Sequence, residues 1–158
     1  DSLFYSVQVA AFNTLDQAMN RATQIDDGAP SAIVTPVRMG DQGVWYRVLA
    51  GALPTARAAD SLLQELWRSR KLERPQGTIL RTPEAFRLGR RVPRTDAEAD
   101  VLGLRARGVP GYIVGAPDGT ARVYVGAFDL SEQARAVDSL LSAAGITGTL
   151  VQRMGIAP

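Results

Sequence analysis

The sequence of 158 residues contains no cysteine and no histidine. The absence of cysteine excludes disulfides, a thiolate nucleophile, iron–sulfur clusters and thiolate-bound zinc. The absence of histidine excludes a Ser-His-Asp triad, an imidazole base and a histidine-bound metal. Catalysis would rest on carboxylates, Ser, Tyr and the single lysine, Lys71. We therefore expect no metal and no cofactor, and a binding protein rather than an enzyme.

Long hydrophobic runs are also missing. No stretch approaches the roughly 18 apolar residues that span a bilayer, and no charged-then-apolar leader opens the sequence. Because the chain starts at Asp1 rather than Met, we expect a processed or cloned fragment with parts upstream. The remaining composition, 46% hydrophobic and 22% charged, is typical of a folded globular protein. The length suits one medium domain or two small ones.

Lysine is scarce: Lys71 is the single lysine, and every other cationic residue is an arginine. The cationic residues are unevenly distributed along the chain. Residues 68–94 carry nine cations against the two carboxylates of Glu73 and Glu84, whereas the rest of the chain is net negative. Such a basic segment suits an anionic partner. A solvated arginine-rich surface explains it equally well, so both interpretations stay open.

An internal repeat divides the chain. Residues 46–53 (YRVLAGAL) resemble residues 121–128 (ARVYVGAF) at an offset of 75. Residues 56–63 and 134–141 are also nearly identical, at an offset of 78. We prefer the gap-free offset of 75, because it aligns Gly51 with Gly126 and also keeps the apolar helix positions in register. The pattern predicts a duplication.

Each half shows the element order β-α-β-β-α-β. In the first half, strands are expected at 4–12, 32–37, 44–50 and 77–81, with helices opening at Asn13 or Thr14 and at Pro54-Thr55 and a hairpin turn at 40–43. In the second half, strands are expected at 85–89, 111–115, 121–125 and 148–153, with Thr95 capping the first helix. The predicted fold class is α+β. It comprises two tandem RNP/ferredoxin-like βαββαβ domains, residues 1–82 and 83–158, each a four-stranded antiparallel sheet with two helices on one face.

The opposite face of each sheet is then free for a ligand. Strand alternation predicts that Trp45, Arg47 and Leu49 point outward, together with Gln8 and Ala10. An outward indole beside a guanidinium and an amide suits a planar or ring-shaped ligand. The alternative is that Trp45 covers a sheet edge or meets the other half of the chain.

The segments YSVQVAAF (5–12) and WYRV (45–48) leading to Gly51 resemble the SPOR (sporulation-related repeat) domain family, in two tandem copies of which the second is diverged. The resemblance implies binding to glycan strands of bacterial peptidoglycan, preferably those stripped of stem peptides. It also implies an extracytoplasmic location in the periplasm or cell envelope, at division septa, with a membrane anchor only upstream. Partners would be peptidoglycan and envelope or division proteins.

The family's glycan contacts carry over to Gln8, Trp45, Arg47 and the last-strand apolar residue Ile79. Ala11 stands where the family has a small polar residue, and Leu49 lies on the same outward row. The second half offers a further surface in which Arg87 replaces the Gln, Thr120 replaces the Trp and Tyr124 supplies a stacking ring. Its members are Arg87, Arg122, Tyr124 and Leu150. We expect the first half to be the main glycan reader and the second to be auxiliary.

Two alternatives remain. Tandem sheets could serve as a scaffold for envelope proteins, and RNA-recognition motifs use the same element order to stack bases on sheet aromatics. Because the aromatic- and glycine-rich third strand of those motifs is absent, we expect no nucleic acid. The two ligands differ in salt dependence, since phosphate binding weakens steeply with salt and neutral stacking only mildly.

Overall fold

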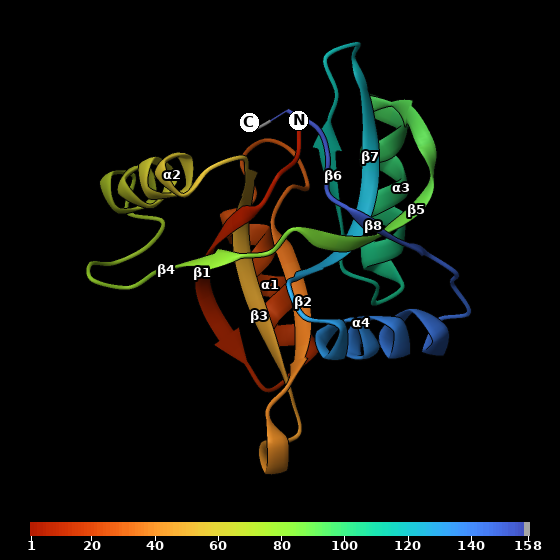
Figure 1. Ribbon diagram of the computed structural model, residues 1–158, viewed down its shortest axis with the longest axis horizontal. Helices are drawn as coiled ribbons and strands as arrows, with labels where there is room; N and C mark the ends of the chain where they lie inside the picture. Colours follow the sequence, from red (N-terminus) through yellow and green to blue (C-terminus); the bar gives the residue numbers. More distant parts are fainter. Residues whose placement is uncertain (157–158) are drawn as a thin grey trace.

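The computed structural model describes residues 1–156 and contains two four-stranded antiparallel sheets (Figure 1). The first sheet has the strand order β2-β3-β1-β4 and the second the order β6-β7-β5-β8. The chain is therefore α+β, with two RNP-like βαββαβ units in tandem, as predicted. The elements are β1 (Tyr5–Phe12), α1 (Leu15–Ile25), β2 (Ile33–Arg38), η1 (Gly40–Gln42), β3 (Val44–Leu53), α2 (Ala56–Arg68), β4 (Thr78–Arg81), β5 (Glu84–Pro93), α3 (Arg94–Ala106), β6 (Gly111–Gly115), β7 (Thr120–Phe128), α4 (Ser131–Ala143) and β8 (Thr149–Gln152).

The expected caps open the first two helices. Thr14 Oγ1 accepts a hydrogen bond from Gln17 N, and Thr55 Oγ1 accepts one from Ala58 N. Each hydroxyl satisfies an N–H group that has no partner within its helix. Two details differ from expectation. A 3-10 turn occupies the predicted hairpin at 40–43, and α3 begins at Arg94, with Pro93 rather than Thr95 in the capping position.

The repeat offset of 75 is visible in three dimensions. Gly51 and Gly126 both adopt a φ of 76°, a left-handed conformation that favours glycine. A Cβ at Gly51 would lie 2.5 Å from Leu62, and one at Gly126 would lie 2.8 Å from Val137. Leu62 and Val137 are themselves 75 residues apart, so each glycine admits the equivalent side chain of the following helix. The gap-free alignment at an offset of 75 therefore pairs residues that have equivalent positions in the packing of the two halves.

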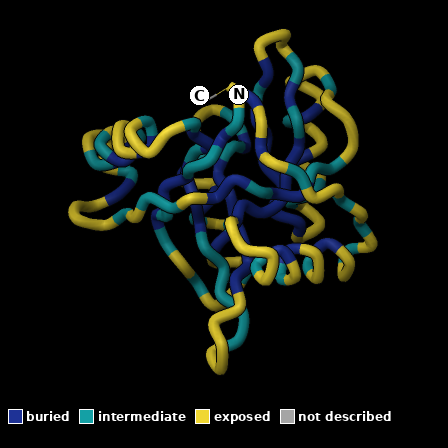
Figure 2. The backbone as a smooth tube through the Cα atoms, in the orientation of Figure 1, coloured by how far each residue is buried: buried dark blue, intermediate teal, exposed yellow. Residues whose placement is uncertain are grey.

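The two sheets pack against each other through the faces that their own helices do not cover. Buried apolar residues from both halves form one core at this contact, which occupies the dark-blue centre of Figure 2. Its principal members are Leu3, Ile33, Leu49, Ala52, Ala85, Tyr112, Val114, Tyr124 and Ala127. The second half therefore covers part of the face that the sequence predicted to be open.

Helix α4 also joins the halves. It lies alongside β2, the edge strand of the first sheet, as well as against its own sheet (Figure 1). Near this contact, the Ala127 amide donates to Thr35 Oγ1 over 3.2 Å. Within residues 1–156, the main contacts of α2 are instead with β1, β3 and β4 of its own sheet. The two halves are thus packed asymmetrically.

Polar contacts also hold the two halves in this arrangement. The Asp26 carboxylate and the Arg105 guanidinium are 2.6 Å apart and largely buried, and Arg105 also donates to the carbonyl of Ala32. Near the chain ends, Leu3 N donates to the Arg153 carbonyl over 3.0 Å, and Ser2 and Met154 form an isolated β-bridge. Because these contacts and the shared core link both halves, we expect them to behave as one rigid body.

A charged side chain lies inside the contact between the sheets. Arg153 is fully buried, and its Nη2 donates to Thr82 Oγ1 at 2.7 Å and to Ser6 Oγ at 3.1 Å. Its Nε and Nη1 have no hydrogen-bond partner among the described residues. Nearby, burial raises the pKa of Tyr112 to about 12, against a smaller lowering effect of the Arg153 charge.

Candidate binding face

The register of β1, β2 and β3 defines which residues share the face of the first sheet that points away from its helices. Trp45 lies opposite Val37 of β2. Arg47 lies opposite Thr35 of β2 on one side and Ala11 of β1 on the other. Opposed residues in an antiparallel pair point to the same side, and alternate residues in one strand do so as well. Trp45 and Arg47 therefore stand on the face away from α1, which is turned toward the viewer in Figure 1.

Gln8 and Ala11 reach this face through an irregularity in β1. The register shifts between Gln8, opposite Leu49, and Ala10, opposite Val48. The extra residue leaves Val9 and Ala10 both on the helix side, where they join the first core. Ala11 consequently takes the outward position that simple alternation had given to Ala10. Gln8 is partly buried and Ala11 is exposed.

Leu49 was wrongly predicted to be a ligand contact. It points to the expected side of the sheet, but it is 0% exposed because the second sheet covers it. Strand alternation identifies the face of a residue and does not reveal what packs on that face. Leu49 therefore belongs to the core between the sheets.

Ile79 was wrongly placed on the same face. It lies opposite Val7, and both belong to the helix side of the sheet, where Ile79 packs against the first core. The neighbour of Gln8 on β4 is instead Thr78, which is exposed. Thr78 was missed from the sequence because neither the first nor the last strand of a unit determines by itself the register in which the two strands pair.

Two expectations for the second sheet also fail. Tyr124 is 1% exposed, and its hydroxyl donates to the Met154 carbonyl at 3.2 Å, so it cannot stack a ligand. Leu150 is 48% exposed but lies opposite Phe86, on the helix side of that sheet. Arg87 and Arg122 do share the face of Tyr124, since Arg87 lies opposite it and Arg122 is two residues away on the same strand.

The surviving first-sheet set is Gln8, Ala11, Trp45 and Arg47, with Thr78 added; we call it the first outer row. Trp45 and Arg47 are both partly buried, so their side chains are held against the sheet while part of each remains accessible. No ion pair within residues 1–156 involves Arg47. The row thus offers an aromatic surface, an amide, a hydroxyl and an uncommitted guanidinium.

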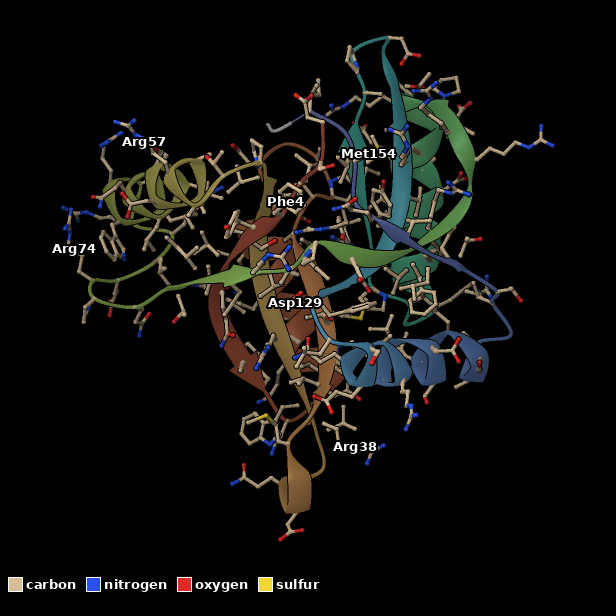
Figure 3. All side chains as sticks on the ribbon, in the orientation of Figure 1. Phe4, Arg38, Arg57, Arg74, Asp129 and Met154 are labelled. Atoms are coloured by element: carbon tan, nitrogen blue, oxygen red, sulfur yellow. The ribbon has the colours of Figure 1, made fainter. Side chains whose placement is uncertain are left out.

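An ion pair links the end of β4 to the second half. The guanidinium of Arg81 at the end of β4 is 2.7 Å from the carboxylate of Asp129, which follows β7. The same guanidinium lies 5.7 Å from the ring centre of Phe4. Figure 3 shows Phe4 and Asp129 on this side of the molecule. A cavity of about 370 Å³ adjoins the pair and is lined also by Glu84 and Gln152.

Residues 2–72 match the family model of the SPOR domain. The matched segment runs from the N-terminal residues through α2 and contains the first outer row except for Thr78 on β4. The second half lies outside this match and shares the topology of the first half. No curated protein and no solved structure gives a significant match to the chain.

Neither a membrane-spanning helix nor a metal cluster is present in the described part of the chain. None of the helices within residues 1–156 is both long and apolar enough to cross a bilayer. The same residues contain no group of three or more Asp or Glu side chains arranged to hold a metal ion.

Proposed function

We propose that the chain is a non-catalytic binding module for peptidoglycan, which it contacts through the first outer row. The SPOR domain is a peptidoglycan-binding module of the bacterial envelope, and the match to residues 2–72 supports this role. The observation that carries the proposal is the position of Trp45 and Arg47, which lie side by side on the face away from α1, outside the core between the sheets, and stay partly accessible.

The chemistry of the row suits a glycan strand. A sugar ring presents C–H groups that stack on an indole, which buries apolar area while the ring hydroxyls stay hydrated. The Gln8 amide and the Thr78 hydroxyl can each donate and accept hydrogen bonds with hydroxyl or acetamide groups. Ala11 contributes no hydrogen bond, because it lacks the hydroxyl of the small polar residue expected there.

Arg47 provides the basis for specificity. Removal of stem peptides leaves a free lactyl carboxylate on the sugar, and a guanidinium binds a carboxylate through two parallel hydrogen bonds. An amide-linked stem peptide would remove that charge and add bulk. We therefore propose that the preferred strands lack stem peptides and that the chain acts in the extracytoplasmic envelope, at sites such as the division septum where such strands occur.

The structure favours this ligand over a nucleic acid. Tyr112 and Tyr124 are the aromatic residues on the ligand-side face of the second sheet, and both are buried between the sheets. The second sheet therefore offers a base no accessible ring within residues 1–156, and on the ligand-side face of the first sheet the ring is the Trp45 indole. Such a site matches a short glycan segment better than the successive bases that an RNA-recognition sheet stacks.

The test is co-sedimentation with stripped and with intact peptidoglycan at two salt concentrations. Trp45→Ala combined with Arg47→Ala should abolish sedimentation with the stripped polymer while circular dichroism stays unchanged. Arg57→Ala, on the outer surface of α2 (Figure 3), is the control and should sediment as the wild type does. Retention of the double variant would refute the proposed face. Stronger binding of the wild type to a single-stranded RNA than to stripped peptidoglycan would favour the nucleic-acid alternative.

A further inference from the structure

The strand registers make the two sheets equivalent residue by residue. Gln8 lies opposite Leu49 in the first sheet, and Arg87 lies opposite Tyr124 in the second. On the far side of the same strands, Thr78 and Thr149 are the partners of Gln8 and Arg87. Arg87 therefore occupies the position of Gln8. In the same way, Arg122 occupies the position of Arg47.

The contact between the sheets uses the equivalent row from each half. Ile33 and Leu49 of the first sheet share one buried core with Tyr112 and Tyr124 of the second. Val114, opposite Arg122, also joins this core, and Thr35, opposite Arg47, accepts a hydrogen bond from Ala127, so the outer rows border the contact between the sheets. The outer row of the second sheet contains Arg87 and Arg122, both partly buried but accessible.

The second outer row has lost its aromatic residue. Thr120 stands at the position of Trp45, and its hydroxyl donates to the Asp118 carboxylate at 2.5 Å. These hydrogen bonds hold the pKa of Asp118 below its ordinary value, so the carboxylate and the hydroxyl are already paired within a turn. This row therefore has no ring on which a sugar can stack.

What the row offers instead is positive charge. Arg87 and Arg122 lie on hydrogen-bonded strands, displaced by two residues, which places long side chains within reach of one anion. The irregular stretch of β5 between Leu88 and Val92 contains a further exposed arginine, Arg90. Within residues 1–156, six other cations form ion pairs, and none of these three does.

We propose that this second outer row is a separate site for the carboxylate groups of the same glycan polymer. The inference rests on the proposed function, because that function supplies the carboxylate-bearing strand. Two guanidiniums that grip one carboxylate form charge-assisted hydrogen bonds, which are stronger than neutral ones. Since both outer rows belong to one rigid molecule, a second weak contact raises the overall affinity by making binding at that site intramolecular.

The experiment compares Arg87→Gln/Arg122→Gln with the control Arg57→Gln/Arg135→Gln, which removes two exposed helix arginines and the same charge. Affinity for stripped glycan is measured at several salt concentrations. We expect the first variant to lose about five- to tenfold in affinity and to show a shallower salt dependence, while the control changes less than twofold. Equal affinities of the two variants would overturn the second site.

A second arm uses stripped glycan whose carboxylates have been reduced to alcohols. On this polymer the wild type and Arg87→Gln/Arg122→Gln should bind equally, whereas Trp45→Ala should still weaken binding through loss of stacking. A difference that persists on the reduced polymer would contradict carboxylate recognition. Absence of any wild-type binding to stripped glycan would remove the proposed function itself, so the two failures are distinguishable.

Discussion

Replacement of Leu49 by alanine separates the role of this residue in the fold from the role of Trp45 in binding. The two residues lie four apart on the same face of β3, but Leu49 is fully buried between the sheets and Trp45 is partly accessible. Leu49→Ala removes about three buried carbon groups at roughly 0.8 kcal/mol each, or about 2.4 kcal/mol of transfer free energy. A cavity that fails to collapse adds about 24 cal/mol per Å³.

We therefore expect Leu49→Ala to lower the free energy of unfolding by about 3–5 kcal/mol, within the range known for buried leucines. Urea unfolding followed by circular dichroism measures the loss, and tryptophan fluorescence reports on the first half. The two signals should remain coincident, because the lost contact is shared by both sheets. Below its unfolding transition, the variant should bind stripped glycan with the affinity of the wild type.

Two results would contradict this reasoning. A loss below about 1 kcal/mol would mean that the contact between the sheets contributes little to stability. Loss of glycan binding by a fully folded Leu49→Ala protein would mean that Leu49 contributes to the binding face.

Two further predictions concern the contact between the halves. Asp26→Ala leaves the Arg105 guanidinium without its carboxylate and should cost roughly 3 kcal/mol, the lower end for a broken buried pair; a double-mutant cycle with Arg105→Ala measures the coupling, and a coupling near zero would refute it. Since burial raises the pKa of Tyr112 to about 12 and the unfolded value is near 10, the folded state keeps its proton between these pH values while the unfolded state loses it. The free energy of unfolding should therefore fall as pH rises from 10 to 12, by up to about 2–3 kcal/mol. Tyr112→Phe should flatten this decline in urea titrations, and an equally steep decline in that variant would contradict the assignment.

The sequence predicted the element order and the faces of β3, because these depend on local signals. The threonine caps at Thr14 and Thr55 and the alternation around Trp45 were correctly read. The register of β4 against β1 was not predicted. In the structure this register places Ile79 on the helix side of the sheet. Register depends on pairing between segments far apart in the chain, and single strands do not encode it.

The burial of Leu49 and Tyr124 was not predictable from either half alone. Each residue has the outward position that alternation assigns, and each half read by itself leaves that position open. Only the packing of one sheet on the other removes these residues from solvent. The bulge in β1 places Ala10 on the helix side, and this was not predictable from β1 alone either. The position of a bulge depends on how the strand pairs with its partner strand.

The meeting of equivalent rows has a consequence for the ancestry of the molecule. A single unit cut from this chain would expose the apolar patch formed by Ile33 and Leu49. Because the covering patch comes from the corresponding row of the other unit, two copies of one unit could cover each other in a symmetric pair. The present chain departs from such a pair, because α4 packs against β2 without an equivalent contact of α2 and because Thr120 stands where the first half has Trp45.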